Sequence, residues 1–430
     1  MLTSSSSFSR IWSVLLLLVV TSACTLTLAA DTPTAFPSNG GMAAKLQSFV
    51  DNHVIAGAVV LVADKEKVLD LETLGYSDAP AKKPMAGNNL FYIASMTKCF
   101  TATALMMMVD GGKVDINDPV EKYLPEFKGQ MVEEAANKGH PHPPQHPITV
   151  KEVMNHTAGL AKGPWADRFS LEAMVKDIAK KPLQWEPGTK MQYSIGPAVG
   201  GRIVEVVSGI PYCQFIQQRL LDPLGLKDTT FWPNAEQATR LALTHHYNPE
   251  TKTMEPLQHR PDQLKEGKIG NVPPIVFSQF GISMINGYAR HYANPAGSLF
   301  STATDCGTFC QMILNGGTWQ GKRYISEAAW KQMTSNQTGD VLVGNGDLAY
   351  GLGFFVQRKA VDGGSSVGSF GHHGARKTKM WIEPQNGIVM VLMVQCNELT
   401  HNQEHDLYAA FHKQATVRFG KVGKRDSAAQ

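Results

Sequence analysis

Residues 91–98 are Phe91-Tyr92-Ile93-Ala94-Ser95-Met96-Thr97-Lys98, and this stretch governs the interpretation of the rest of the chain. A serine and a lysine three residues apart lie on one face of a helix. An apolar run at residues 104–109 follows, which predicts that the stretch enters a buried helix. Free backbone N–H groups and the helix dipole favour developing negative charge at such a helix start. The spacing therefore makes Ser95 a candidate nucleophile beside Lys98.

Length and composition place the chain among large globular proteins. Its 430 residues are 43% hydrophobic and 18% charged, which is enough apolar material for a large core. The net charge of +3 is small, and no long basic block alternates with aromatic residues. Nucleic acid is therefore not an expected partner.

The N-terminus has the pattern of an export signal. Arg10 precedes an apolar run at residues 11–20. A run of this length is typical of a signal peptide and is too short to span a bilayer. No later hydrophobic stretch approaches the length of a membrane span, so we expect an exported protein, periplasmic or secreted, without a stable membrane span.

Two cleavage patterns compete in this signal. Small residues permit ordinary cleavage near residue 23 or residue 30. A lipoprotein-type cut before Cys24 would instead leave a lipid anchor on that cysteine. Thr21 occupies the position where this second pattern usually has leucine, so ordinary cleavage is favoured.

The cysteine pattern favours free thiols over disulfides. The chain has six cysteines, at positions 24, 99, 213, 306, 310 and 396. Removal of the signal segment with Cys24 leaves an odd number, and no C-x-x-C pair is present. We expect mostly free, buried thiols.

Two groups of histidines raise the question of further chemistry. His140, His142 and His146 lie in a proline-rich loop without a nearby cysteine or a recognised ligand spacing to a carboxylate, so no metal site is expected. His156 follows a predicted helix and could be catalytic. A histidine at a helix end more often hydrogen-bonds a carbonyl or packs, which favours a structural role.

Hydrophobic periodicity and turn residues predict a strand–helix–strand order along the mature chain. Helices are expected at residues 43–50, from the Ser95 stretch to the stop at 110–112, and at 119–125, 148–154, 200–207, 211–220, 305–314 and 406–417. Strands are expected at 56–63, 68–74, 351–356, 378–382 and 388–394, with a hairpin at 64–67. Strands at both ends predict one antiparallel sheet flanked by helices, of the α/β (α+β) class, split by a mostly helical insertion.

Domain boundaries follow from this order. Residues 1–30 are assigned to the signal peptide and residues 31–430 to a single catalytic domain. The sheet-bearing part is expected at about residues 40–110 and 290–420, and the helical part at about 111–289. Loop 128–147 and the weakly patterned residues 233–292 are expected to carry specificity.

Several motifs in order carry a family resemblance. Ser95 and Lys98 form S-x-x-K, a motif found in β-lactamases and penicillin-binding proteins. Further blocks of the sequence match the same enzymes in the same order. The first runs from the helix after Ser95 to residue 125, and the others lie at 148–160, 186–231, 295–317 and 368–384. The chain resembles the serine β-lactamase and penicillin-binding-protein superfamily, in its class C-like branch, over nearly all of residues 40–415. A β-lactamase/transpeptidase-like fold is implied.

The resemblance assigns roles to individual residues. It implies that Ser95 is the acylated nucleophile, Lys98 the motif lysine and Tyr193 the tyrosine of the Y-x-N motif. It implies an oxyanion hole made by the backbone N–H groups of Ser95 and Ala375. The substrate-binding K-T-G motif is replaced by three residues of this chain, His372, His373 and Gly374.

The chemistry of the nucleophile leaves two proton paths open. Serine needs a base, and lysine is protonated at pH 7 unless its pKa falls by about three units, which costs roughly 4 kcal/mol. Alternatively, a charged Lys98 could hold Tyr193 near its phenolate form. We favour a Tyr193–Lys98 pair that titrates as one coupled unit.

Two departures from the motifs change the expected substrate. Ile195 replaces the asparagine of Y-x-N, and its side chain cannot donate or accept a hydrogen bond. Residues 201–209 and 368–371 resemble the family VIII carboxylesterases, although those enzymes usually carry W-G-G at the K-T-G position. Together these features shift the expected substrate from amides and lactams toward esters.

Three functional hypotheses remain at this point. The first is a serine hydrolase that forms an acyl-enzyme on Ser95 and acts on small esters, with weak β-lactam hydrolysis. The second is a class C-type β-lactamase or D-specific peptidase acting on β-lactams or peptidoglycan peptides. The third is a penicillin-binding protein with little turnover. No metal or organic cofactor is implied.

Overall fold

The computed structural model describes residues 41–133, 140–161, 170–257, 293–361 and 364–421. The predicted signal peptide with Cys24 lies outside the described residues, as does the segment 258–292. The described residues belong to one compact unit, Ala35–Gln430. Among them, no helix combines the length and apolar character that crossing a membrane requires.

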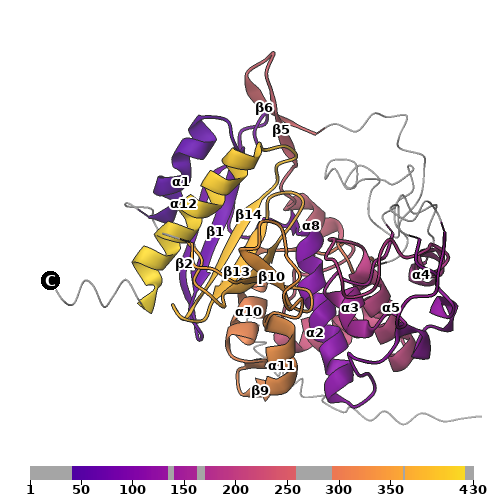
Figure 1. The fold of residues 1–430 in the computed structure, drawn as a ribbon. Helices are drawn as coiled ribbons and strands as arrows, with labels where there is room; N and C mark the ends of the chain where they lie inside the picture. The colour runs from indigo at the N-terminus through magenta and orange to yellow at the C-terminus, as the bar shows by residue number, and fades with distance from the viewer. Residues whose placement is uncertain (1–40, 134–139, 162–169, 258–292, 362–363, 422–430) are drawn as a thin grey trace, which may run out of the picture. The chain divides into compact units, whose positions relative to one another are not determined.

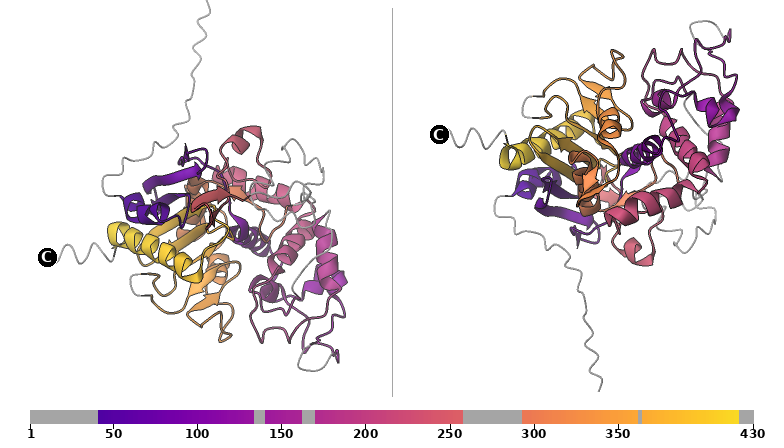
Figure 2. Two further views of the ribbon diagram at one scale, coloured as in Figure 1. Left: turned by 90° about the horizontal axis from the view of Figure 1, so that it is seen from above. Right: turned by 90° about the horizontal axis from the view of Figure 1, so that it is seen from below.

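An eight-stranded sheet joins the two ends of the described chain (Figure 1). Its strand order is β10 (Leu348–Tyr350), β11 (Phe355–Gln357), β12 (Phe370–His373), β13 (Lys379–Glu383), β14 (Ile388–Val394), β1 (Gly57–Ala63), β2 (Val68–Asp78) and β3 (Lys83–Pro84). Every neighbouring pair is antiparallel. The predicted single sheet is confirmed: β1, from the N-terminal part, pairs with β14, from the C-terminal part, as Figure 2 shows from two further sides.

Helices cover both faces of the sheet. Side chains of a strand alternate between faces, so Val59 and Leu61 of β1 join one apolar cluster while Val60 and Val62 join another. The second cluster lies beneath α1 (Met42–Asp51) and α12 (His401–Phe419), and α10 (Ala303–Leu314) packs on the opposite side. Strands buried on both faces explain why β1 and β14 are continuous apolar runs.

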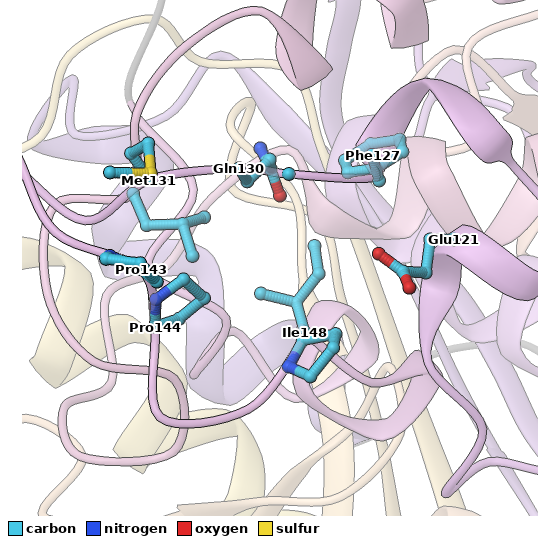
Figure 3. A pocket seen from close by; sticks show the side chains of 10 residues that line it. Glu121, Phe127, Gln130, Met131, Pro143, Pro144 and Ile148 are labelled. Carbon is cyan, nitrogen blue, oxygen red and sulfur yellow. The ribbon is translucent and has the colours of Figure 1, made fainter.

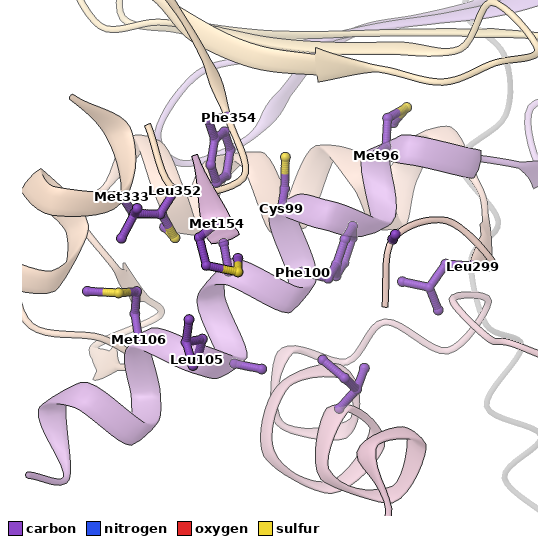
Figure 4. Packing of buried hydrophobic residues seen from close by; sticks show 14 of the residues in the cluster. Met96, Cys99, Phe100, Leu105, Met106, Met154, Leu299, Met333, Leu352 and Phe354 are labelled. Carbon is purple, nitrogen blue, oxygen red and sulfur yellow. The ribbon is translucent and has the colours of Figure 1, made fainter. Parts of the chain in front are cut away.

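The helix that follows Ser95 is the centre of the larger core. Every residue of α2 (Thr97–Asp110) from Thr97 to Met106 is buried, including the polar residues Thr97, Lys98, Thr101 and Thr103. Figure 4 shows Met96, Cys99 and Phe100 pointing into this packing. The Phe100 ring stacks on Phe309 of α10 with 4.0 Å between ring centroids. Burial of one such ring contributes about 1.5–3 kcal/mol, so α2 is held firmly in place.

The predicted helical insertion lies between the two parts of the sheet in sequence. Its elements are η2 (Val120–Lys122), η3 (Pro125–Phe127), α3 (Val150–Met154), α4 (Leu171–Ala179), α5 (Gly196–Ser208), α6 (Tyr212–Ile216), the π-helical turn η5 (Gln217–Leu221), α7 (Asp222–Leu224), α8 (Ala235–Thr239) and the hairpin β5 (His245–Asn248) with β6 (Thr253–Pro256). Beyond the insertion lie β7 (Phe300–Ser301), which pairs with β4 (Phe91–Tyr92), the hairpin β8 (Thr318–Trp319) with β9 (Lys322–Arg323), and α11 (Glu327–Thr334). Helices α5 and α11 both contact α2.

Several predicted boundaries are corrected by local chemistry. Of the strand predicted at 351–356, only residues 355–356 belong to β11, and the residues before them form a turn in which Gly353 adopts a φ of +79°. The helix predicted at 406–417 begins at His401, because Thr400 and Gln403 form a capping box. The helix predicted at 119–125 is two short 3-10 turns on either side of Leu124. The five described cysteines are free as predicted, and all but Cys213 are buried.

Candidate active site

Ser95 lies in a strained turn at the entrance to α2. It belongs to η1 (Ala94–Met96) and is half-buried, while Lys98 one turn later is only 3% exposed. Ala94 has a φ of +45°, a left-handed conformation that costs a non-glycine residue about 1–3 kcal/mol. Such strain directly before a candidate nucleophile is typical of functional sites. The fold compensates it, since Leu299 N–H and Ala94 C=O both bond to the Thr97 hydroxyl.

Lys98 is placed to act on the Ser95 hydroxyl. Its Nζ lies 3.1 Å from Ser95 Oγ and donates to the Ala296 carbonyl at 2.5 Å. Burial lowers the pKa of Lys98 to about 7, and Cys99 opposes this shift. A lysine of this pKa is partly neutral at pH 7, so it can take a proton from a serine hydroxyl.

Tyr193 adjoins the same pair from the loop before α5. The Lys98 Nζ lies 4.7 Å from the centroid of its ring, and its hydroxyl lies 3.4 Å from His372 Nε2. The residue is 38% exposed, yet burial raises the pKa of its hydroxyl, against a hydrogen bond to Ser95 that lowers it. Tyr193 is therefore a phenol at neutral pH. Ser95, Lys98 and Tyr193 lie together, and the two pKa shifts favour a neutral lysine over a phenolate as the base.

His372 lies at the far side of Tyr193, near the end of β12. Its Nδ1 is 2.7 Å from the His373 carbonyl, and its Nε2 is 3.0 Å from the Tyr350 hydroxyl. The side chain is buried, and burial holds the pKa of His372 well below its usual 6.5, assisted by His373 and Lys98.

The other two predicted substrate-binding side chains do not join this cluster. His373 is exposed, and its ring lies 5.6 Å from that of His372, 5.3 Å from Phe355 and 6.5 Å from Tyr408 of α12. Strand alternation explains this placement, since neighbouring residues of β12 point to opposite faces. Ile195 is half-buried and packs against the larger core.

Gly374 and Ala375 follow β12 and approach the Ser95 turn. A Cβ on Gly374 would come within 2.5 Å of the Ile93 carbonyl, so only glycine permits this approach. The Ala375 N–H makes no hydrogen bond to any described residue. A free N–H beside the nucleophile is what the predicted oxyanion hole requires.

Two aromatic residues of the site carried no clear sequence signal for a role here. The hydroxyl of the fully buried Tyr350 contacts His372, and nothing in its neighbourhood distinguishes it from a core tyrosine. His156 was expected to be structural, and its ring centroid lies 4.6 Å from that of Tyr193. Its Nδ1 accepts the Ser194 N–H at 3.2 Å, and burial holds the pKa of His156 well below 6.5.

The described pockets lie elsewhere. One of about 280 Å³ is lined by Phe127, Met131, Pro143, Pro144 and other residues of loop 128–147, together with Leu183 (Figure 3). Neither this pocket nor a larger one beside α1 includes Ser95. Among the described residues, no three His, Cys, Asp or Glu side chains are grouped to hold a metal ion.

Comparison with known proteins decides the family. The family model described as Beta-lactamase matches residues 42–415. The chain belongs to the beta-lactamase family.

Two curated relatives illustrate its diversity. Esterase EstB from Burkholderia gladioli is 28% identical over 243 residues, covering 51% of this chain and 59% of the relative. A Salmonella agona protein with the provisional name D-alanyl-D-alanine carboxypeptidase is 26% identical over 375 residues, covering 81% of each chain.

Solved structures support the same fold. EstCE1, described as a hydrolase with promiscuous acyltransferase activity, superimposes with a TM-score of 0.69. The alignment covers 87% of this chain and 98% of EstCE1 at 22% sequence identity. The superposition establishes the shared fold. Membership of the beta-lactamase family supports a hydrolase activity.

Proposed function

We propose that the protein is a serine hydrolase that forms an acyl-enzyme on Ser95 and acts on small esters. One observation carries the proposal: a lysine with a pKa of about 7 lies 3.1 Å from the Ser95 hydroxyl. A protein that only bound its ligand without acylation would have no need for such a base.

The acylation step follows from this geometry. Neutral Lys98 takes the proton of Ser95 Oγ as that oxygen forms a bond to the ester carbonyl carbon. The carbonyl oxygen becomes an oxyanion that the N–H groups of Ser95 and Ala375 can stabilise, each donor contributing about 3 kcal/mol. Collapse breaks the bond to the alcohol oxygen, which takes a proton from the Tyr193 hydroxyl, and Lys98 returns its proton to Tyr193. Water then releases the acid by the reverse sequence.

Two features favour esters over amides and lactams. The Ile195 side chain packs on the core and offers no polar contact to an amide. Esterase EstB is also among the relatives, although the carboxypeptidase name keeps the second hypothesis in view. We also propose export to the periplasm or beyond the cell, from the N-terminal signal pattern.

A substrate comparison tests the proposal. Purified protein is expected to release p-nitrophenol from a short-chain ester and to turn over a chromogenic cephalosporin much more slowly. Faster cephalosporin turnover would favour the β-lactamase hypothesis. Stoichiometric acylation by a penicillin without turnover of any ester would favour the binding-protein hypothesis.

A further inference from the structure

The hydrogen bonds of His372 fix where its proton lies. The His373 carbonyl can only accept, so the contact at 2.7 Å requires a hydrogen on Nδ1 of His372. In the neutral ring, Nε2 then carries a lone pair and no hydrogen. The hydroxyls of Tyr350 at 3.0 Å and Tyr193 at 3.4 Å both donate to it.

The surroundings oppose a positive charge on this ring. His372 is 1% exposed and Tyr350 is fully buried. The Phe355 ring lies 4.9 Å from the imidazole, and the titratable groups that face it are Tyr193, Tyr350, His156, His373 and Lys98. None is a carboxylate that could compensate an imidazolium.

Three cationic side chains follow His372 closely in the sequence, and each of them bonds to or packs on another residue. Lys377 pairs with Glu404 of α12 at 2.6 Å, and Arg376 bonds to the Asn397 side chain. The Lys379 Nζ lies 4.6 Å from the centroid of Tyr408, also on α12. These contacts hold Lys377 and Lys379 against α12.

We infer that His372, saturated by two phenols and a carbonyl, makes the acyl site selective for substrates without a carboxylate. Because the ring of His372 is neutral and both of its nitrogens are already bonded, an anionic acyl group beside β12 would meet no positive charge from this residue. A carboxylate that loses its hydration without gaining a compensating charge is strongly disfavoured. This inference rests on the proposed esterase function and names the charge class of its substrates.

A matched pair of esters tests the inference. p-Nitrophenyl valerate and mono-p-nitrophenyl glutarate have the same leaving group and five-carbon acyl chain, but only the glutarate carries a charge. At pH 8 the wild-type kcat/KM is expected to favour the valerate by about tenfold or more. A ratio near one, or preference for the glutarate, would overturn the inference.

Variants locate the selectivity at His372. His372→Lys places a charged donor at β12 and is expected to lower the valerate-to-glutarate ratio by about tenfold. His372→Gln, which cannot become charged, and Lys379→Gln, on the opposite face, are expected to keep the ratio. Equal changes in the lysine and glutamine variants would contradict the role of charge.

A measurement on wild-type protein removes dependence on variant folding. Imidazole ¹⁵N spectra, assigned by the signal missing in His372→Gln, are expected to show a protonated Nδ1 and an unprotonated Nε2 from pH 6 to 8. An imidazolium pattern at pH 7 would refute the inference. Absence of Ser95-dependent turnover of both esters would instead refute the proposed function itself.

Discussion

At the scale of single residues, burial separates the roles of Lys98 and Tyr193. Burial disfavours the charged form of each group, so it lowers the pKa of the lysine and raises that of the phenol. At pH 7 Tyr193 is therefore a neutral phenol, and Lys98 is divided between its charged and neutral forms. The sequence alone favoured a Tyr193–Lys98 pair that titrates as one unit, and it could not give the direction of either shift, because burial cannot be inferred from a motif.

This assignment predicts the pH dependence of the reaction. The deprotonated lysine is the active form and its pKa is about 7, so kcat/KM for a neutral ester should rise with pH through about 7 and then level off. Lys98→Arg, which cannot deprotonate, should lower kcat by about 10²–10⁴-fold, as measured by release of p-nitrophenol. A flat profile from pH 5 to 9 in the wild type would argue against Lys98 as the base.

At the scale of elements, the site depends on how closely β12 approaches the Ser95 turn. The end of β12 contacts η1, and Gly374 permits that contact because a side chain would meet the Ile93 carbonyl. The residues of β13 and β14 were largely predictable from short apolar runs, whereas β12 was not predicted as a strand, because residues 370–373 do not form an apolar run. The partnership of Tyr350 with His372 was not predictable either, since it joins side chains whose contact depends on the packing between strands.

Gly374→Ala tests the importance of this approach. The added methyl would displace the end of β12 and the Ala375 N–H from the nucleophile, so kcat should fall by about 10²–10³-fold. Gly87→Ala serves as the control, because its Cβ would make an ordinary contact of 3.5 Å to Leu71 and its φ is not positive. Full activity in a folded Gly374→Ala protein, judged by circular dichroism, would exclude Ala375 as an oxyanion donor.

At the scale of the whole molecule, a buried contact between His412 and Glu383 fastens the C-terminal helix to the sheet, and burial lowers the pKa of His412 below 6.5, so the imidazole is largely neutral at pH 7. His412 Nε2 of α12 lies 3.1 Å from Glu383 Oε1 of β13, and the Ser366 hydroxyl also bonds to this carboxylate. Burial alone would raise the pKa of Glu383, but the bonds from His412 and Ser366 outweigh it and hold the pKa below 4.5. Its stabilising contribution is therefore present above pH 4.5 and lost as pH falls through the lower folded value.

His412→Ala should lower the free energy of unfolding by about 1–3 kcal/mol, because it removes one of the hydrogen-bond partners of a buried carboxylate. His405→Ala, at an exposed position of the same helix, should change it by less than about 0.5 kcal/mol. Urea denaturation at pH 7 measures both values. Similar values for the two variants would mean that the buried pair does not fasten α12.

The family, the single sheet and the Ser95–Lys98 pair were accessible from sequence because motifs and apolar runs are local patterns. The direction in which His373 points was not anticipated, since it depends on the register of β12 beside β13.

Acyl-enzyme mass mapping tests the central claim most directly. Wild-type protein is mixed with p-nitrophenyl valerate, quenched in acid during turnover and digested. The peptide that contains Ser95 should gain the mass of a valeryl group, and Ser95→Ala should show neither this gain nor turnover. Turnover that persists in Ser95→Ala, or an acyl group found on another residue during turnover, would contradict the account.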